Sequence, residues 1–303
     1  MTKEIRNLKV TTLAENSVIP PYLGQWGLSL LLELVDTDGT RRKMVFDTGI
    51  HRESLLHNVK EMKVDLSDVD CLAISHGHHD HTAATAEVVK LAKRPKVYAH
   101  PHTFLPRFRE DRTGERRRHG VPEGEGVAEI EQAGGEVVLS KDAVELLPGV
   151  WTTGQIPRAT AFERALPPDK GRRDLIVVDG EEVEDRILDD QALWMNVHDF
   201  GPLVITGCAH AGPLNTILHV QKLGGFNEIG GLIGGTHLVG RSDRYVQQTI
   251  RELRRVELKL MSPCHCTGFK AMTKLWQAFP RQFVLNFSGR AIDVGKPPQS
   301  RLI

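Results

Sequence analysis

The sequence has few cysteines, no excess of charge of either sign and no long apolar run. Four cysteines in 303 residues are too few for a disulfide framework and indicate a reducing compartment, so we expect a cytoplasmic protein. Lys plus Arg and Asp plus Glu both number 39, which argues against a nucleic-acid binder and against a polybasic membrane anchor. No apolar run approaches the roughly 18 residues that span a bilayer. The first residues also lack the apolar stretch of a secretory signal. We therefore expect a small-molecule partner, and neither nucleic acid nor a membrane.

The apolar pattern predicts an α/β fold. Hydrophobic residues make up 40% of the chain, which is enough for a sizeable core. Short β-rich runs alternate with helical patterns in both halves, as when residues 43–46 are followed by an apolar helix face at 55–62. Ser242 is suited to cap a later helix, and we expect a further strand at residues 256–260. Since no low-complexity linker divides the halves, one sandwiched α/β/β/α domain over residues 1–303 is the economical prediction.

One segment, around residues 104–126, has a different character, because charged side chains crowd together in it and glycine and proline follow. We predict a solvated surface loop or insertion here. The alternative is a lip that faces the substrate, with arginines such as Arg109 and Arg118 available to bind an anion.

A histidine cluster directly follows the predicted strand at residues 71–74. It has the pattern His-x-His-x-Asp-His, formed by His76, His78, Asp80 and His81. Imidazole suits zinc, iron or manganese, and a carboxylate beside imidazoles is typical of hydrolytic sites. Two metals about 3.5–4 Å apart can activate water and clamp the reacting oxygens. The spacing therefore predicts a metal site, with His79 in the variable place and pointing away.

Three more histidines also follow apolar strands, each in a turn containing glycine or proline. They are His210, His237 and His265. Functional sites on α/β scaffolds collect at such strand ends. We predict His210 and His265 as metal ligands. His237 stays open between a ligand, a substrate contact and an outer supporting role. As a catalytic group it would contact an oxyanion or protonate a leaving group, while Asp80 would also orient the nucleophile.

These motifs resemble the metallo-β-lactamase-fold superfamily, whose hallmark is the His-x-His-x-Asp-His strand end. Asp47-Thr48-Gly49 is similar to its upstream Asp-Thr-Gly. The resemblance implies an αββα four-layer sandwich with a two-metal site at one edge, where Asp47 supports the metal histidines by hydrogen bonding. It also implies that one metal is held by His76, His78 and His210, and the other by Asp80, His81 and His265.

A narrower resemblance covers nearly the whole chain. The ordered motifs around Gly27, Asp47, Ser75–His81, Cys208 and His265 are similar to the branch labelled 7,8-dihydropterin-6-yl-methyl-4-(β-D-ribofuranosyl)aminobenzene 5′-phosphate synthase. That label implies a condensation that forms a carbon bond. Because it is spread over many members of the branch, it constrains the substrate only weakly.

Two departures from the superfamily pattern put parts of the site in question. Members of the superfamily usually have a Gly-His in the middle of the chain, but here Gln155 stands in place of that histidine. Cys208 stands where an Asp that bridges the metals is usual. Cys208 is therefore either a bridging ligand or a buried inert thiol, or His210 takes the vacant position. Without the Asp bridge, a mononuclear site is an alternative to the binuclear one. Gln155 and Arg158 are candidates for substrate binding.

Other side chains are expected to be structural. Alternation along an extended segment would place Cys264 and Cys266 opposite His265, in the core. Trp26 is expected in the core, and His119 at the surface or in packing.

The leading functional prediction is a metal-dependent hydrolase that uses metal-activated water on a small anionic, ester-type substrate, phosphorylated in one version. We expect two divalent metal ions. Zinc is the first candidate for both, and manganese and iron are the alternatives. The alternatives in function are the carbon-bond-forming synthase and a redox or sensory metal-binding module.

Overall fold

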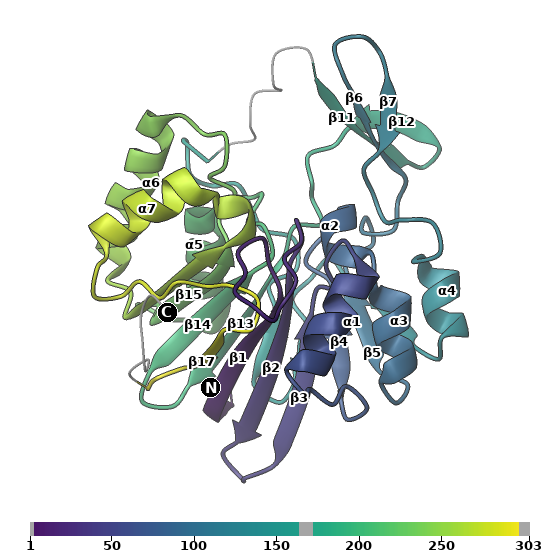
Figure 1. The fold of residues 1–303 in the computed structure, drawn as a ribbon. Coiled ribbons are helices and arrows are strands. Elements are labelled where there is room, and N and C mark those ends of the chain that lie inside the picture. The colour runs from purple at the N-terminus through teal and green to yellow at the C-terminus, as the bar shows by residue number, and fades with distance from the viewer. Residues whose placement is uncertain (1–2, 164–171, 297–303) are drawn as a thin grey trace.

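The computed structural model describes residues 3–163 and 172–296 (Figure 1). Within these ranges no helix is long and apolar enough to cross a membrane. The helices are α1 (Arg52–Glu61), α2 (His79–Thr82), α3 (Thr85–Leu91), α4 (Val127–Gln132), α5 (Pro213–Gly224), α6 (Asp243–Val256), α7 (Phe269–Ala278) and the 3-10 helix η1 (His265–Thr267). The strands of the large sheet are β1 (Glu4–Ala14), β2 (Ser29–Asp36), β3 (Arg41–Phe46), β4 (Cys71–Ala73), β5 (Lys96–Ala99), β8 (Glu136–Leu139), β9 (Glu145–Leu147), β10 (Val150–Thr152), β13 (Ala192–Val197), β14 (Gly201–Thr206), β15 (Gly231–Gly235), β16 (Leu260–Cys264) and β17 (Ala291–Asp293).

The large sheet consists of two leaves joined through β1. Its hydrogen-bonded order is β16-β15-β14-β13-β1-β2-β3-β4-β5-β8. β1 pairs along most of its length with β2, but with β13 only at Glu4↔Asn196 and Ile5↔Val197. This narrow joint lets the leaf from β2 to β8 and the leaf from β13 to β16 fold over one another.

Alternation along the strands builds the core between the leaves. In β2, Leu30 and Leu32 belong to the same buried cluster as Leu203 and Ile205 of β14. Successive side chains of a strand point to opposite faces, so the intervening residues must pack on the outside of each leaf. Leu31 indeed packs outward with the helices of its own half. The near-continuous apolar runs read in the sequence are those of strands buried on both faces.

Helices cover the two outer faces. α1, α3 and α4 lie on the leaf from β2 to β8, and α5, α6 and α7 lie on the leaf from β13 to β16 (Figure 1). Outward side chains such as Val45 and Val204 pack beneath them. This arrangement confirms the predicted αββα four-layer sandwich.

The charged segment at residues 104–126 forms part of a second, smaller sheet. Its strands are β6 (Arg107–Glu110), β7 (Arg116–Arg118), β11 (Arg173–Val178) and β12 (Glu181–Glu184), in the order β12-β11-β6-β7. This sheet stands beyond α2, at the end of the sandwich that carries the histidine loop (Figure 1). The expectation of a solvated loop is wrong for Arg107, which is 1% exposed.

One strand is displaced from its predicted place. α6 continues to Val256, and β16 begins only at Leu260. Val256, the first residue of the predicted strand, packs with the helix cluster that includes Leu253 and is the end of a helix face. The predicted cap of α6 is confirmed, because Ser242 Oγ accepts a hydrogen bond from Tyr245 N at 3.3 Å.

Candidate metal centre

Four strand ends from both leaves supply the site. The loop containing His76 to His81 follows β4, and the other candidate ligands follow β14, β15 and β16. β14, β15 and β16 are mutually parallel, so their carboxyl ends meet at one edge of the sheet. The structure thus brings together the residues predicted to ligate a metal, although His210 and His265 are more than a hundred residues from the motif.

The first group consists of His76, His78 and His210. His76 Nε2 lies 3.1 Å from His78 Nδ1 and 3.2 Å from His210 Nε2. Burial, followed by the charges of neighbouring groups, lowers the pKa of all three imidazoles well below the usual value. These rings are therefore neutral and aim ring nitrogens at one another, which is how a cation is ligated.

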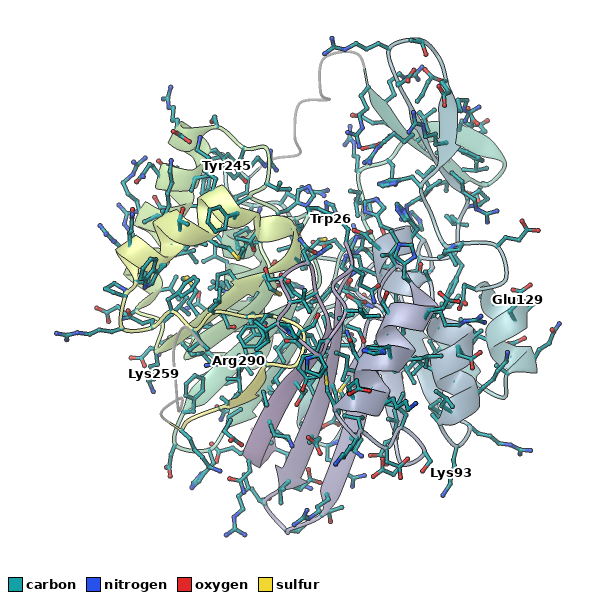
Figure 2. All side chains as sticks on the ribbon, in the orientation of Figure 1. Trp26, Lys93, Glu129, Tyr245, Lys259 and Arg290 are labelled. Atoms are coloured by element: carbon teal, nitrogen blue, oxygen red, sulfur yellow. The ribbon has the colours of Figure 1, made fainter. Side chains whose placement is uncertain are left out.

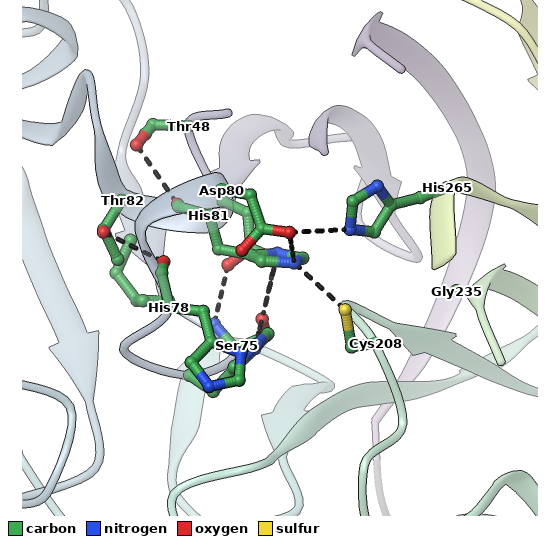
Figure 3. Close-up of polar contacts among 12 residues, drawn as sticks. Thr48, Ser75, His78, Asp80, His81, Thr82, Cys208, Gly235 and His265 are labelled. Atoms are coloured by element: carbon green, nitrogen blue, oxygen red, sulfur yellow. Dashed lines mark hydrogen bonds and ion pairs between the residues drawn. The ribbon is translucent and has the colours of Figure 1, made fainter. Parts of the chain in front are cut away.

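The second group consists of Asp80, His81 and His265 (Figure 3). Asp80 Oδ2 lies 3.3 Å from His265 Nε2 and 3.9 Å from His81 Nε2. Burial raises the pKa of Asp80, but His81 and His265 outweigh it and hold the pKa below its usual range. Burial lowers the pKa of His81, but Asp47 and Asp80 outweigh it and raise the pKa to about 9. The carboxylates thus stabilise positive charge at this position.

Cys208 lies between the two groups. Its Sγ is 3.1 Å from His81 Nε2 (Figure 3). It also lies within 4.8 Å of the ligand atoms of His76 and His210 on one side, and of those of His81 and His265 on the other. The thiol is 2% exposed, and burial raises its pKa well above the usual value. Cys208 Sγ thus lies within reach of both groups, and the choice between a bridging ligand and a buried inert thiol stays open as it did in the sequence.

Asp47 and Ser75 fix which nitrogens face the centre. Asp47 Oδ2 accepts from His81 Nδ1 at 2.7 Å and from Ser75 Oγ at 2.7 Å. Because the Ser75 hydroxyl donates to Asp47, its oxygen accepts from His76 Nδ1 at 2.9 Å. Both imidazoles are therefore held through Nδ1 and turn Nε2 toward the centre. Asp47 itself has a φ of 60°, a conformation that Asp tolerates better than most residues.

Residues at the end of β1 hold His265, and the sequence reading did not find them. Glu15, which is fully buried, accepts from His265 N at 2.6 Å through Oε1. Asn16 lies with Oδ1 3.1 Å from His265 Nδ1 and donates through Nδ2 to His265 O at 3.0 Å. Asn16 thus orients the ring with Nε2 toward Asp80. Some 250 positions separate these partners, so no local pattern could have shown them.

A buried ion-pair cluster supports the histidine loop. Arg107 donates to Asp185 Oδ2 at 2.7 Å and to Asp189 Oδ1 at 2.5 Å. Asp189 Oδ2 in turn accepts from Gly77 N at 2.7 Å. A Cβ at Gly77 would lie 2.0 Å from Thr103 O and 2.2 Å from the guanidinium of Arg107. Glycine between His76 and His78 is therefore required by this close approach.

The small sheet and the β1–β2 loop bring two unpredicted side chains to the site. The ring centroid of His119, just after β7, lies 4.3 Å from that of His78 and 5.0 Å from that of His79. Trp26, expected in the core, is 49% exposed and lies 5.5 Å from His265, ring centre to ring centre. Figure 2 shows Trp26 near the upper ends of the large sheet's strands, where the two halves meet.

The other predicted site residues differ in how close they lie to the centre. The ring of His237 is tilted by 45° against that of His210, with ring centroids 4.1 Å apart. Gln155 is exposed. Arg158 donates to Arg186 O at 2.6 Å, and burial lowers its pKa. Several arginines of the charged segment are already paired: Arg109 with Asp174, Arg116 with Glu182, and Arg117 with Glu115.

The expectation that Cys266 faces away from His265 is wrong. The strand ends at Cys264, and Cys266 lies in the 3-10 helix η1. A 3-10 helix turns by about a third of a revolution per residue, so the two-residue alternation of a strand no longer applies. Cys264 stays in the core between the leaves, while Cys266 joins Cys208 and His237.

The donor set fits a divalent metal ion. Among the described residues, His78 Nε2, Asp80 Oδ1 and His237 Nδ1 are buried and have no hydrogen-bond partner. Buried polar atoms are almost always hydrogen-bonded, so several unpartnered ones in one place call for a ligand. Imidazole, carboxylate and thiolate together are donors that zinc and other transition metals accept. Such a centre can polarise a substrate oxygen and activate water.

Fold and site together define an α/β-sandwich protein suited to metal ions, and the comparisons agree. The model of the metallo-β-lactamase superfamily matches residues 28–206. The chain belongs to this superfamily.

Named relatives extend over almost the whole chain. It is 30% identical to the 7,8-dihydropterin-6-methyl-4-(β-D-ribofuranosyl)-aminobenzene-5′-phosphate synthase of Methanocaldococcus jannaschii, over 95% of this chain and 97% of that protein. It is 28% identical to an uncharacterised protein of the same organism, over 94% of this chain and 100% of that protein. The solved structure of Tm1679, a metal-dependent hydrolase of the β-lactamase superfamily, matches with a TM-score of 0.74 and 22% identity, covering 95% of this chain and 100% of that chain.

Proposed function

We propose that the protein is a metal-dependent hydrolase with two divalent metal ions, for which zinc is the first candidate. The observation that carries the proposal is the placement of Cys208 between two groups of buried ligand atoms. His76, His78 and His210 would hold one ion, and Asp80, His81 and His265 the other. When bound, such ions lower the pKa of water and stabilise negative charge on a substrate oxygen.

Side chains of the protein have three tasks in this proposal. Asp47 and Asn16 hold the rings of His81 and His265 in the orientation that presents Nε2. Asp80 Oδ1, unpartnered among the described residues, can accept a proton or orient the attacking group. His237 Nδ1 is likewise unpartnered and stands next to His210, where it can hydrogen-bond a substrate oxygen or protonate a leaving group.

The substrate we propose is a small anionic ester, and phosphorylated esters belong to this class. Arg158 supports this, because its Nε is buried and has no hydrogen-bond partner among the described residues. A guanidinium with a free donor binds carboxylate or phosphate. Trp26 adds an exposed aromatic face beside His265, which favours a substrate with an apolar or aromatic part.

The test is a screen of zinc-loaded and manganese-loaded protein against phosphodiester, phosphomonoester, lactone and β-lactam substrates, beside the variant His78→Ala. We expect the variant to lose activity by at least about 100-fold, since it removes a ligand. His198→Ala is the matched control, because the side chain of His198 is exposed and its ion pairs are with Glu4 and Asp199. Activity that survives His78→Ala would refute the proposed site.

A second candidate is a carbon-bond-forming synthase. It is favoured by the named synthase relative, which aligns over 95% of this chain. Metal-loaded protein would be incubated with aminobenzoate and phosphoribosyl pyrophosphate, and the product sought by mass spectrometry. Formation of a ribofuranosylaminobenzene phosphate that is lost in His78→Ala would establish the synthase. Absence of that product, from protein that hydrolyses an ester, would exclude it.

A further inference from the structure

Two thiols and an imidazole lie together at one side of the centre. The ligand atoms of Cys208, His237 and Cys266 all lie within 4.8 Å of one another. They come from the loops after β14, β15 and β16, which are adjacent in the sheet. The superfamily pattern used above assigns a ligand role to neither His237 nor Cys266.

The backbone around Cys266 is built to bring its thiol to this position. His265 has a φ of 52°, and this turns the chain out of β16 into η1. Cys266 Sγ then lies 3.5 Å from Cys208 O. A Cβ at Gly235 would lie 2.7 Å from that sulfur and 2.3 Å from Gly207 O. Glycine at 235, labelled beside Cys208 in Figure 3, therefore leaves the space that the thiol fills.

His237 is held beside the thiols by an equally unusual backbone. Its φ is 47°, in the left-handed region that few residues other than glycine adopt. Val239 N donates to Cys266 O at 3.0 Å, which ties the His237 loop to η1. The ring leaves Nδ1 buried and without a hydrogen-bond partner among the described residues. Strained backbone concentrates where a side chain has to be placed for a task other than packing.

We propose that Cys208, His237 and Cys266 are a thiolate-rich ligand set that takes a thiophilic divalent cation such as zinc. In tetrahedral zinc sites the metal lies about 2.3 Å from sulfur and about 2.0 Å from nitrogen. Ligand atoms around one ion are then roughly 3.5–4 Å apart, which the observed cluster accommodates. Thiolates select zinc, cadmium or cobalt over magnesium, calcium or manganese. This inference rests on the metal centre proposed above. The new ligand set shares Cys208 with that centre, and it gives His237 a ligand role in place of the substrate contact considered there.

Cobalt(II) gives a direct readout, because thiolate ligation produces a charge-transfer band in the near ultraviolet that scales with the number of thiolates. Full-length protein freed of metal with a chelator would be titrated with Co²⁺. We expect the band in the wild type, and a fall to about half in Cys266→Ser and in Cys208→Ser, since each removes one of two thiolates. Cys264→Ser is the matched control, because Cys264 is equally buried and lies in the core between the leaves.

The outcomes separate cleanly. A wild-type spectrum without the band, or a full band in Cys266→Ser, overturns the inference. If Cys266→Ser does not fold by near-ultraviolet circular dichroism, Cys266→Ala takes its place with the same expectation. His78→Ala should keep the band, because His78 is outside the set. A wild type that shows the band but hydrolyses nothing would refute the hydrolase and leave this ligand set standing.

Discussion

Asp47→Asn is the sharpest test of how the protein orients its metal ligands. The wild-type Oδ2 accepts two hydrogen bonds, from His81 Nδ1 and from Ser75 Oγ, and Oδ1 accepts a third from Ser75 N, all at 2.7 Å. An amide in this place has one acceptor atom, so its NH₂ group faces at least one of these donors. If the NH₂ group faces His81, the imidazole loses its acceptor. If it faces Ser75 N, two donors meet and the pocket that holds His81 is disturbed. Asn tolerates the φ of 60°, so the backbone is not the cause of any loss.

The magnitude follows from that contact. A hydrogen bond to a charged group contributes about 1.5–3 kcal/mol. Removing the outer partner of a metal-binding histidine costs about 10–100-fold in metal affinity, or roughly 1.4–2.7 kcal/mol. The two ranges agree, so we expect the dissociation constant for zinc to rise by about one to two orders of magnitude.

The measurement is a competition titration of zinc against a chromophoric chelator, with circular dichroism as a check of folding. Asp36→Asn is the matched control. Asp36 is also a fully buried carboxylate, but it pairs with Lys3 and Arg42 at the opposite end of β2. It should lose stability and keep its zinc affinity. An affinity of Asp47→Asn within about threefold of the wild type would refute the supporting role of Asp47.

Three further predictions concern stability and the entrance to the site. Arg107→Met should lower the free energy of unfolding by about 3–5 kcal/mol in urea denaturation, because it leaves Asp185 and Asp189 buried without their cation. Removal of the metal by a chelator should lower the melting temperature, since zinc at a hundred times its dissociation constant contributes about 2.7 kcal/mol to the folded state. Trp26→Phe should abolish most of the tryptophan quenching caused by Co²⁺, because this indole stands 5.5 Å from the ring of His265.

Each of these has a control in the same chain. Arg116→Met breaks an exposed pair with Glu182 and should cost at most about 1 kcal/mol, so an equal loss in both arginine variants would count against the buried cluster. Trp276→Phe, at a 43% exposed position on α7, should leave the quenching unchanged. If chelation leaves the melting temperature of the wild type unchanged, as it would that of a protein without metal, metal binding does not stabilise the fold. His78→Ala, which lacks one proposed ligand, should respond less to the chelator than the wild type.

The sequence alone could predict those site residues that lie close together in the chain. His76, His78, Asp80 and His81 are close in sequence, and their spacing alone indicated a metal motif at a strand end. The apolar, β-rich runs of β2 and β14 likewise predicted buried strands, and the superfamily and the fold are confirmed. Local composition was sufficient here because a strand buried on both faces is apolar along nearly its whole length.

What could not be read depends on contacts between distant segments. Arg107 looked like one more member of a charged row, and only the carboxylates of Asp185 and Asp189 make it a buried residue. Glu15 holds His265 across the whole chain. The position of Cys266 was predicted wrongly because the extended segment was assumed to continue through it. The left-handed backbone of His265 instead ends the strand at Cys264. In each case the decisive partner has no signature in the neighbouring sequence.

The narrow joint between the leaves has a consequence for biosynthesis. The histidine motif is complete once residue 81 has been made, but Cys208, His210, His237 and His265 lie on strand ends of the other leaf. A nascent chain that stops before residue 265 therefore holds only part of the ligand shell. Metal affinity grows with the number of ligands already in place, and binding and folding are coupled. If the proposed centre binds metal, we therefore expect its full affinity only after residue 265 has been made, and the bound metal would tie one leaf to the other.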